Sequence, residues 1–154
     1  MNIFVTSPWP AESAICLPDK HICKMPVETC QLLSIVASEK WGHGYGTLPK
    51  EDGTPYKTEK GAFRNHPCTK WAMESIHNAY WLIKWGLNLS DEYCLRYNKT
   101  HSCYKTLVDA YYLFLRVRLQ KSLHLPGQCL KNGNLIKAVI HSLLIKGILP
   151  QNPG

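Results

Sequence analysis

A stripe of apolar and small polar side chains constrains the fold of this chain more than any other feature. The stripe begins after Pro67, a residue suited to the first position of a helix, and recurs every three or four residues. Because that spacing places its members on one helical face, it predicts the main core helix. We expect Gly86 to kink or end this helix and a second helix to start at Ser90 and run to about Tyr97. The stripe consists of Trp71, Ser75, Asn78, Leu82, Trp85 and Leu89.

The rest of the chain also has mainly helical spacing. Residues 1–18 predict a short strand or extended arm followed by a turn, and residues 38–66 predict a long loop rich in glycine. Pro26 predicts either a kink or a fresh helix start within the first helical segment. The predicted fold class is therefore mostly α, a compact single-domain helical bundle with an extended N-terminal arm and a long Gly-rich loop. Further helices are expected at residues 19–37, 104–120 and 134–148.

Length and charge narrow the function classes. The 154 residues suit one domain, and no apolar run approaches the roughly 18 residues of a membrane span. The start of the chain lacks the basic residues of a secretory signal, so we expect a cytoplasmic protein whose seven cysteines are reduced. Lys and Arg number 18 against 11 Asp and Glu, a net charge of +7. That balance favours a polyanionic partner such as nucleic acid, although a basic chain is also simply soluble.

The first helical segment carries a polar constellation. His21, Lys24 and Glu28 stand at positions i, i+3 and i+7, so they line up on one side of a continuous helix, and Asp19 precedes them. A carboxylate held beside a histidine and a lysine is suited to work as a general base or to stabilise a developing cation. The alternative is a solvated helix face with one Lys–Glu pair.

These residues carry a family resemblance. The spacing of Asp19, His21 and Glu28 resembles the motif of the phage pyrimidine-dimer DNA glycosylase (endonuclease V) family. The chain as far as about Cys103 is similar to small phage proteins of that kind, and residues 1–118 would form the glycosylase-like domain, with 119–154 a divergent C-terminal helical segment of the same domain. The shared residues include Asn65-His66-Pro67, Trp71, Asn78, Trp81-Leu82, Glu92-Tyr93 and Arg96-Tyr97.

The resemblance implies a DNA glycosylase and AP lyase acting on damaged or modified pyrimidines in double-stranded DNA. In that family the N-terminal α-amine attacks the sugar, so Met1 or Asn2 would supply the nucleophile, Glu28 would stabilise charge and move protons, and His21 would assist placement. The family exposes a threonine by removing Met1, whereas the larger Asn2 should leave Met1 in place. Either the amine is then that of Met1 or the covalent step is absent. The family also has arginines where this chain has Val27 and Gln31.

Basic and aromatic side chains supply the candidate DNA contacts. A helix starting at Pro67 presents backbone N–H groups suited to phosphate, and aromatic rings in the Gly-rich loop are suited to stack on bases. The alternatives are an ordinary helix cap and a solvated basic face. We expect DNA contacts from Lys20, Lys24, Arg64, Asn65, His66, Lys70, Trp41 and Tyr45.

Two other functions compete with the enzyme. A nucleic-acid-binding phage protein without chemistry would use the same basic and aromatic residues. Three His-x-Cys pairs, at residues 21–23, 66–68 and 101–103, suggest zinc, but structural zinc sites more often use a C-x₂₋₄-C spacing that is absent from the sequence. We therefore expect no metal, no small-molecule cofactor, no membrane partner and a monomer, located in the host cytoplasm if a phage encodes it.

Overall fold

The computed structural model describes residues 2–41 and 44–122. The chain divides into two compact units, residues 1–114 and 115–154, and of the second unit only the end of one helix is described. The functional division expected at residue 118 stays a prediction. The described residues form helices without strands, which confirms a mostly α helical bundle. In chain order the elements are α1 (Pro10–Ile15), α2 (Asp19–Glu39), the 3₁₀ turns η1 (Lys57–Lys60) and η2 (Ala62–Asn65), α3 (Pro67–Glu74), α4 (Ile76–Tyr97) and α5 (Tyr104–Ser122).

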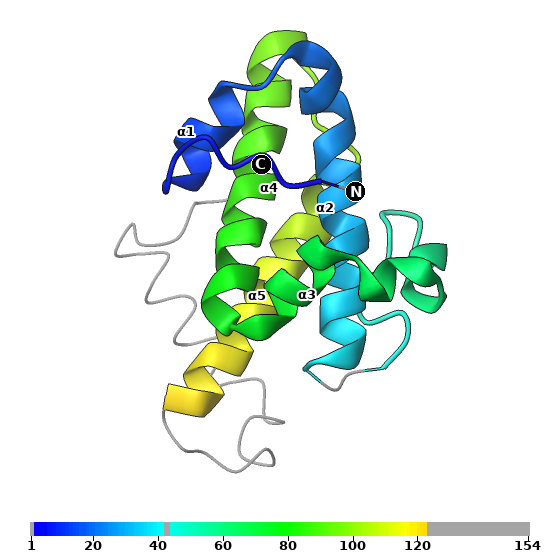
Figure 1. Cartoon of the computed structure of the whole chain (residues 1–154). Helices are drawn as coiled ribbons and strands as arrows, with labels where there is room; N and C mark the ends of the chain where they lie inside the picture. Colours follow the sequence, from blue (N-terminus) through cyan, green and yellow to red (C-terminus); the bar gives the residue numbers. More distant parts are fainter. Residues whose placement is uncertain (1, 42–43, 123–154) are drawn as a thin grey trace. The chain divides into compact units, whose positions relative to one another are not determined.

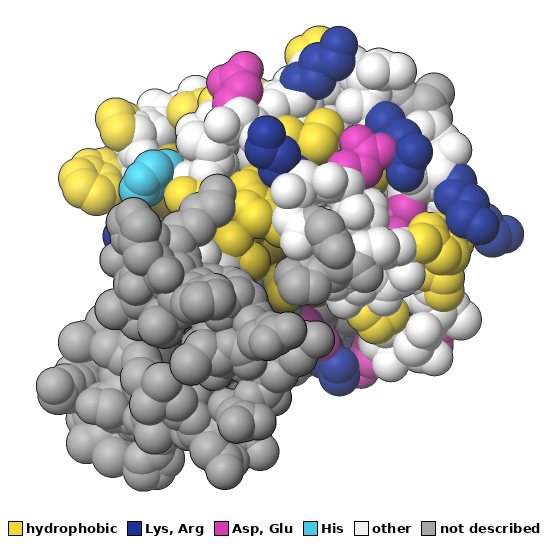
Figure 2. All heavy atoms as spheres, turned by 90° about the horizontal axis from the view of Figure 1, so that it is seen from below, with side chains coloured by type: hydrophobic (Ala, Val, Ile, Leu, Met, Phe, Trp, Pro, Cys, Tyr) yellow, Lys and Arg dark blue, Asp and Glu magenta, His cyan; other side chains and the backbone are white. Residues whose placement is uncertain are grey.

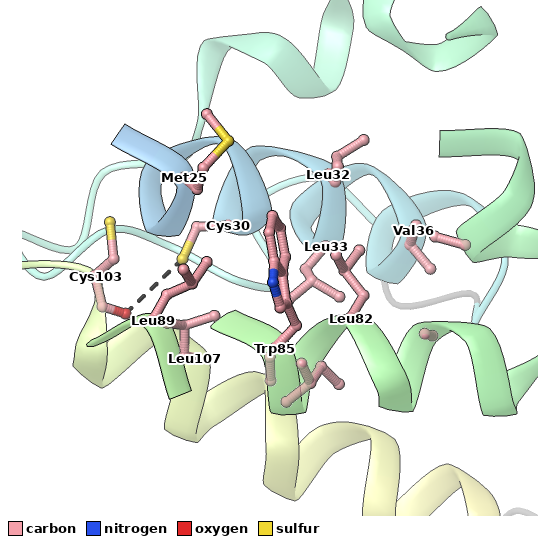
Figure 3. Close-up of a cluster of buried hydrophobic side chains, with 14 of the residues drawn as sticks. Met25, Cys30, Leu32, Leu33, Val36, Leu82, Trp85, Leu89, Cys103 and Leu107 are labelled. Carbon is pink, nitrogen blue, oxygen red and sulfur yellow. Dashed lines mark hydrogen bonds between the residues drawn. The ribbon is translucent and has the colours of Figure 1, made fainter. Parts of the chain in front are cut away.

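The core of the first unit lies between α2 and α4, with α1 against α4 and α3 against both (Figure 1). Trp85 of α4 is fully buried and stands among leucines from α2, α4 and α5 (Figure 3). Fully burying a side chain of this size stabilises a fold by about 2 kcal/mol. This packing fixes α2, and so it also fixes the polar residues on the other faces of that helix.

Helix α2 continues through Pro26, so the interpretation in which a fresh helix starts there is wrong, and the expected kink stays a prediction. Proline removes one backbone hydrogen bond and crowds the preceding turn, at about 3 kcal/mol in a helix interior. Pro26 is itself buried, and Ile22 and Met25 beside it are in the core. Their burial offsets the lost hydrogen bond, and the helix keeps His21 and Glu28 on one continuous element.

The break in the second helical region was predicted at the wrong place. The helix that starts at Pro67 ends at Glu74, and α4 then runs without interruption through Gly86 and Ser90 to Tyr97. Ser75 sits between the two helices in extended backbone and accepts the N–H of Asn78 at 3.0 Å. The Asn78 side chain in turn donates to the carbonyl of Trp71 at 2.8 Å. Ser75 is therefore the cap of α4 rather than a member of a continuous stripe.

The N-terminal arm is extended over residues 2–5, as predicted, but the turn expected after it is a short helix, α1. Ser13 of α1 accepts the N–H groups of Thr6 and Ser7, and the indole of Trp81 donates to the carbonyl of Pro8 at 2.8 Å. These bonds tie the bend of the arm to α1 and α4. The arm therefore enters its position along α2 from an anchored bend.

The Gly-rich loop is organised around a buried carboxylate. Glu59 is fully buried, and its Oε2 accepts the N–H of Gly46 at 2.9 Å. Gly46 has φ of +79°, a left-handed conformation that favours glycine. Burial raises the pKa of Glu59 above its usual value, against the opposing influence of the Gly46 N–H and of Arg64.

Some predictions fall outside the described residues. They concern Met1, the helix at 134–148 and the divergent segment 119–154 beyond the end of α5. Among the described residues, no helix is long and apolar enough to cross a membrane.

Candidate active site

The N-terminal arm lies along the first half of α2. The backbone N–H of Asn2 donates to Oε2 of Glu28 at 3.0 Å, across 26 positions of the chain. The ring of Phe4 meets the imidazole of His21 edge to face, with 5.0 Å between their centroids. The arm therefore contacts α2 twice, through the backbone N–H of Asn2 and through the ring of Phe4. The arm thus gathers residue 2, His21 and Glu28, three of the four predicted catalytic positions.

Glu28 is held between the arm and a lysine. Its side chain is mostly buried, and Nζ of Lys24, one helical turn earlier, lies 3.2 Å from Oε1. One carboxylate oxygen therefore faces a cation while the other faces the nitrogen of Asn2. A buried carboxylate needs such partners, because burial penalises an unpaired charge. So placed, Glu28 can exchange a proton with a group at the nitrogen of residue 2 or stabilise positive charge there.

His21 offers a second polar atom at this place. It is half-buried, and among the described residues its Nδ1 is buried without a hydrogen-bond partner. Buried polar atoms usually have partners. Nδ1 of His21 is thus a hydrogen-bonding atom beside the arm that the fold itself does not use.

The opposite face of the arm lines a cavity of about 290 Å³. Ile3 and Val5 form one wall, and the start of α3 forms the other through Pro67, Cys68 and Trp71. The lining is almost wholly apolar. The ring systems of Trp71 and Trp81 pack edge to face, with 6.0 Å between their centroids. The arm therefore separates a polar cluster on α2 from an apolar cavity at α3.

Several of the residues predicted to contact DNA flank this region. Asn65 is exposed at the end of η2, His66 caps α3 by accepting the N–H of Cys68 at 3.2 Å, and Lys70 is exposed one turn further on. Lys20 and Lys24 are exposed on α2, the helix that carries Glu28. The first three cluster at the cavity side of the arm, and the two lysines belong to the polar side.

Three other predicted contacts lie elsewhere. Trp41 follows the end of α2, which is roughly 16 Å along the helix axis from Glu28 at 1.5 Å per residue. It is half-buried, and its ring packs edge-on against Phe114 with 4.9 Å between centroids. Tyr45 is 49% exposed but lies under Nζ of Lys60, 4.2 Å from the ring centroid.

Arg64 is engaged within the fold. Its Nε pairs with the carboxylate of Glu39 and donates to the carbonyl of Glu59 at 2.7 Å. The guanidinium therefore bridges the end of α2 and η1. Arg64, Trp41 and Tyr45 thus have their own partners within the fold, and none of these partners belongs to the arm.

Asp19, the first residue of the sequence motif, points to a structural network. Its carboxylate pairs with Arg96 at 2.8 Å, and Arg96 also bonds Glu92 and the carbonyls of Ile15 and Leu17. The hydrogen bonds that Arg96 donates to Asp19 and then to Glu92 raise its pKa. The network fastens the start of α2 to the end of α4, so Asp19 positions the helix that carries His21 and Glu28.

Sequence reasoning missed the part played by the arm itself. Ile3 and Val5 alternate with Asn2 and Phe4, a period-two pattern that signals two differently occupied faces. That alternation was a usable signal for an arm packed between two surfaces. Nothing local identified Cys68 as a cavity wall.

The three His-x-Cys pairs are separate in the structure. His21 meets Phe4, His66 caps α3, and Nε2 of His101 lies 3.0 Å from the carbonyl of Cys23. Across residues 2–41 and 44–122, no three His, Cys, Asp or Glu side chains are grouped to hold a metal ion. Each imidazole has its own place in the fold.

The net charge of +7 is not gathered into one band on the face seen in Figure 2. There, basic side chains (dark blue) alternate with acidic ones (magenta) and with hydrophobic ones (yellow). Any DNA contact over this face would therefore be interrupted by acidic groups.

Comparison with known proteins gives one match. The family model described as pyrimidine dimer DNA glycosylase matches residues 1–105. The matched span contains the arm, α1 to α4 and both walls of the 290 Å³ cavity. Comparisons with curated proteins and with solved structures found no match.

Proposed function

The chain belongs to the pyrimidine dimer DNA glycosylase family, and from that premise we propose that it is a DNA glycosylase and AP lyase that acts on damaged or modified pyrimidines in double-stranded DNA. The observation that carries the proposal is the 3.0 Å contact between the nitrogen of Asn2 and Oε2 of Glu28. This contact sets a carboxylate at the start of the chain, and an N-terminal amine and a carboxylate are the two groups that amine-based glycosylase chemistry needs.

In the proposed reaction the neutral N-terminal α-amine attacks C1′ of the damaged nucleotide. An α-amine titrates near pH 8, so an appreciable fraction is neutral at physiological pH. As the glycosidic bond breaks, Glu28 stabilises the positive charge on the sugar. The imine that forms is then resolved by removal of a 2′ proton, which Glu28 accepts in this proposal, and by elimination of the 3′ phosphate.

The identity of the amine depends on processing of the terminus. In a chain that begins at Asn2, the amine is the atom that lies 3.0 Å from Glu28. In a chain that keeps Met1, the amine belongs to the residue before Asn2. It then lies about 3.8 Å from the nitrogen of Asn2, by the spacing of consecutive Cα atoms. The mass of a trapped adduct distinguishes the two.

DNA contacts are proposed on both sides of the arm. Lys20 and Lys24 would neutralise phosphates near Glu28, and Asn65, His66 and Lys70 would contact the strand at the start of α3. Val27 and Gln31, which stand where the family resemblance has arginines, are half-buried and line a different cavity. The grip on DNA is therefore assigned to the lysines and to the α3 cluster, with Arg64, Trp41 and Tyr45 as more distant contributors.

Borohydride trapping tests the proposal. The full chain is incubated with duplexes that carry either a thymine dimer or an abasic site, and adducts are read by gel shift and intact mass. We expect a covalent adduct at residue 1 or 2, and at least a 100-fold slower reaction for Glu28→Gln, the scale of an acid–base contribution. Gln is matched in size and keeps an acceptor for the Asn2 N–H. Glu74→Gln, an exposed change on α3, is the control and should react normally.

Wild-type rates in folded Glu28→Gln would overturn the proposal. An adduct on abasic DNA alone would keep the lyase step and remove the glycosylase step. No adduct, together with salt-dependent DNA binding that Glu28→Gln leaves unchanged, would identify a binding protein without chemistry.

A further inference from the structure

A buried histidine and cysteine stand directly before α5, and the proposed reaction does not use them. His101 is buried, and its Nδ1 accepts the backbone N–H of Cys103 at 3.1 Å. Its Nε2, which carries the proton in this arrangement, donates to the carbonyl of Cys23 at 3.0 Å. The ring of Tyr93 packs edge to face against the His101 imidazole, with 4.8 Å between their centroids. The backbone of Cys103 is thereby fixed at the N-terminal end of a helix that begins at Tyr104.

A second thiol lies beside Cys103. Cys30 of α2 is fully buried, and its Sγ contacts the carbonyl oxygen of Cys103 at 3.8 Å (Figure 3). Burial, followed by contact with Cys103, raises the pKa of the Cys30 thiol well above its usual value. Cys30 therefore stays protonated and acts as a hydrogen-bond donor.

The environment of Cys103 favours its thiolate. Hydrogen bonding from Cys30 is the largest of the influences that lower the pKa of Cys103 to about 5, and the neighbouring His101 and Tyr56 act in the same direction, against the opposing influence of burial. The N-terminal end of α5 acts in the same direction, because a helix N-terminus stabilises negative charge. The two neighbouring thiols are thus unequal, one a thiolate and the other a proton donor.

A cavity gives access to Cys103 from outside. Its volume is about 510 Å³, and Cys103 lines it together with Ser102, Tyr56 and the side of the loop at Lys50. Cys30 is not part of the lining and has no exposed surface. Of the two cysteines, only Cys103 lines the cavity, so a small molecule there meets Cys103 before Cys30.

We propose that Cys103 is an oxidation site for hydroperoxides and that Cys30 resolves the oxidised form into an intramolecular disulfide. The Cys103 thiolate attacks the terminal oxygen of the peroxide, the O–O bond breaks, and the departing alkoxide or hydroxide takes a proton from solvent. This two-electron step leaves a sulfenic acid on Cys103. The sulfur of Cys30 then attacks the sulfenic sulfur, and the hydroxide that leaves combines with the Cys30 proton as water.

The proposed oxidation of Cys103 needs neither DNA nor the N-terminal amine. A test of it therefore gives a result that does not depend on whether the proposed glycosylase activity is found. The 3.8 Å contact between Sγ of Cys30 and the carbonyl oxygen of Cys103 makes the two residues direct neighbours, and a disulfide requires their side chains to turn toward each other. Hydrogen peroxide is small enough for a cavity of about 510 Å³.

The test treats the full chain with one equivalent of hydrogen peroxide, followed by alkylation and peptide mapping without reductant. In wild type we expect loss of two hydrogens and a Cys30–Cys103 cross-link. Cys30→Ser should instead accumulate a sulfenic acid at Cys103 that dimedone traps, and Cys103→Ser should form neither product. Cys94→Ser, which removes an exposed thiol of α4, is the control and should give the wild-type cross-link.

A second measurement on unmodified wild type holds even if a variant fails to fold. The rate of alkylation of Cys103 by iodoacetamide should change less than twofold between pH 6 and pH 8. An ordinary thiol with a pKa of about 8.5 gains roughly 75-fold over the same range, from its thiolate fraction. Oxidation of the exposed Cys16, Cys23 or Cys94 ahead of Cys103, or an ordinary pH profile for Cys103, would overturn the proposal.

Discussion

Gly86 of α4 packs directly against side chains of α2 and α5. A Cβ placed on Gly86 would lie 2.6 Å from Cδ2 of Leu107 and 2.8 Å from Cγ2 of Thr29. Carbon atoms pack best near 3.5–4.0 Å, so the added methyl overlaps both neighbours by about 0.7–0.9 Å. Leu107 is fully buried and Thr29 is β-branched, so neither side chain moves away without disturbing the core.

The free energy of unfolding of Gly86→Ala follows from two opposing effects. Overpacking of a core costs about 1–3 kcal/mol, and two simultaneous overlaps argue for about 2–3 kcal/mol. Replacing glycine by alanine inside a helix returns about 1 kcal/mol. We expect a net destabilisation of about 1–2 kcal/mol, or a fall of about 2–8 °C in melting temperature for a chain of this size.

Urea denaturation followed by circular dichroism measures this change as a shift in midpoint at constant slope. Gly61→Ala is the matched control, because a Cβ there meets its nearest neighbour, the Thr58 carbonyl, at an ordinary 3.6 Å. Trimming the clashing partner should reduce the effect, so Gly86→Ala should cost less by about 1 kcal/mol or more in a Leu107→Ala background. A Gly86→Ala protein as stable as wild type, or a cost unchanged by Leu107→Ala, would refute this account of the packing.

Two further predictions concern groups that shape the fold around the site. Burial raises the pKa of Glu59, so its contribution to stability is fully present below its unfolded pKa near 4.5 and is lost as pH rises through the raised value. In urea titrations, the free energy of unfolding of Glu59→Gln should therefore rise relative to that of wild type as pH increases from 4 to 7. A difference between the two proteins that does not change with pH would contradict a raised pKa of Glu59. Ser75→Ala removes the acceptor for the Asn78 N–H and should lower the free energy of unfolding by about 1 kcal/mol. Ser38→Ala is the control, because the Ser38 hydroxyl donates to the carbonyl of Ile35 one turn earlier and caps no helix. In thermal melts of both variants, Ser38→Ala should change the free energy of unfolding by less than about 0.5 kcal/mol. Equal effects of the two substitutions would argue against the cap.

Local chemistry explains which elements the sequence could predict. Helix α2 and the start of α3 were predicted because apolar spacing and a proline at the first helical position act within a few residues. The boundary at Ser75 was missed because no glycine or proline marks it and the apolar spacing runs on through it. The serine three residues before Asn78 was the available signal, since that spacing is typical of a cap. Gly86 was taken as a helix breaker, whereas its role is to admit Leu107 and Thr29.

No local sequence pattern could predict the contact between Asn2 and Glu28, because the two residues stand 26 positions apart in the chain. Helical spacing placed His21 and Glu28 on one side of α2, and the structure agrees. Spacing alone had no means to indicate what would cover that side. The covering element is set by the bend at residues 6–9 and by the apolar residues of the arm, which are tertiary features.

The two proposed chemistries belong to two different faces of α2. Glu28 turns toward the arm, while Val27 and Gln31 turn toward the 510 Å³ cavity that exposes Cys103. Arginines at positions 27 and 31 would project long charged side chains into that second space. The smaller Val27 and the neutral Gln31 leave it open, so the same two replacements that remove cationic DNA contacts also give small molecules a path to a thiolate. We therefore expect arginines at positions 27 and 31 to favour phosphate at this side of α2, and Val27 and Gln31 to favour the proposed access of an oxidant to Cys103.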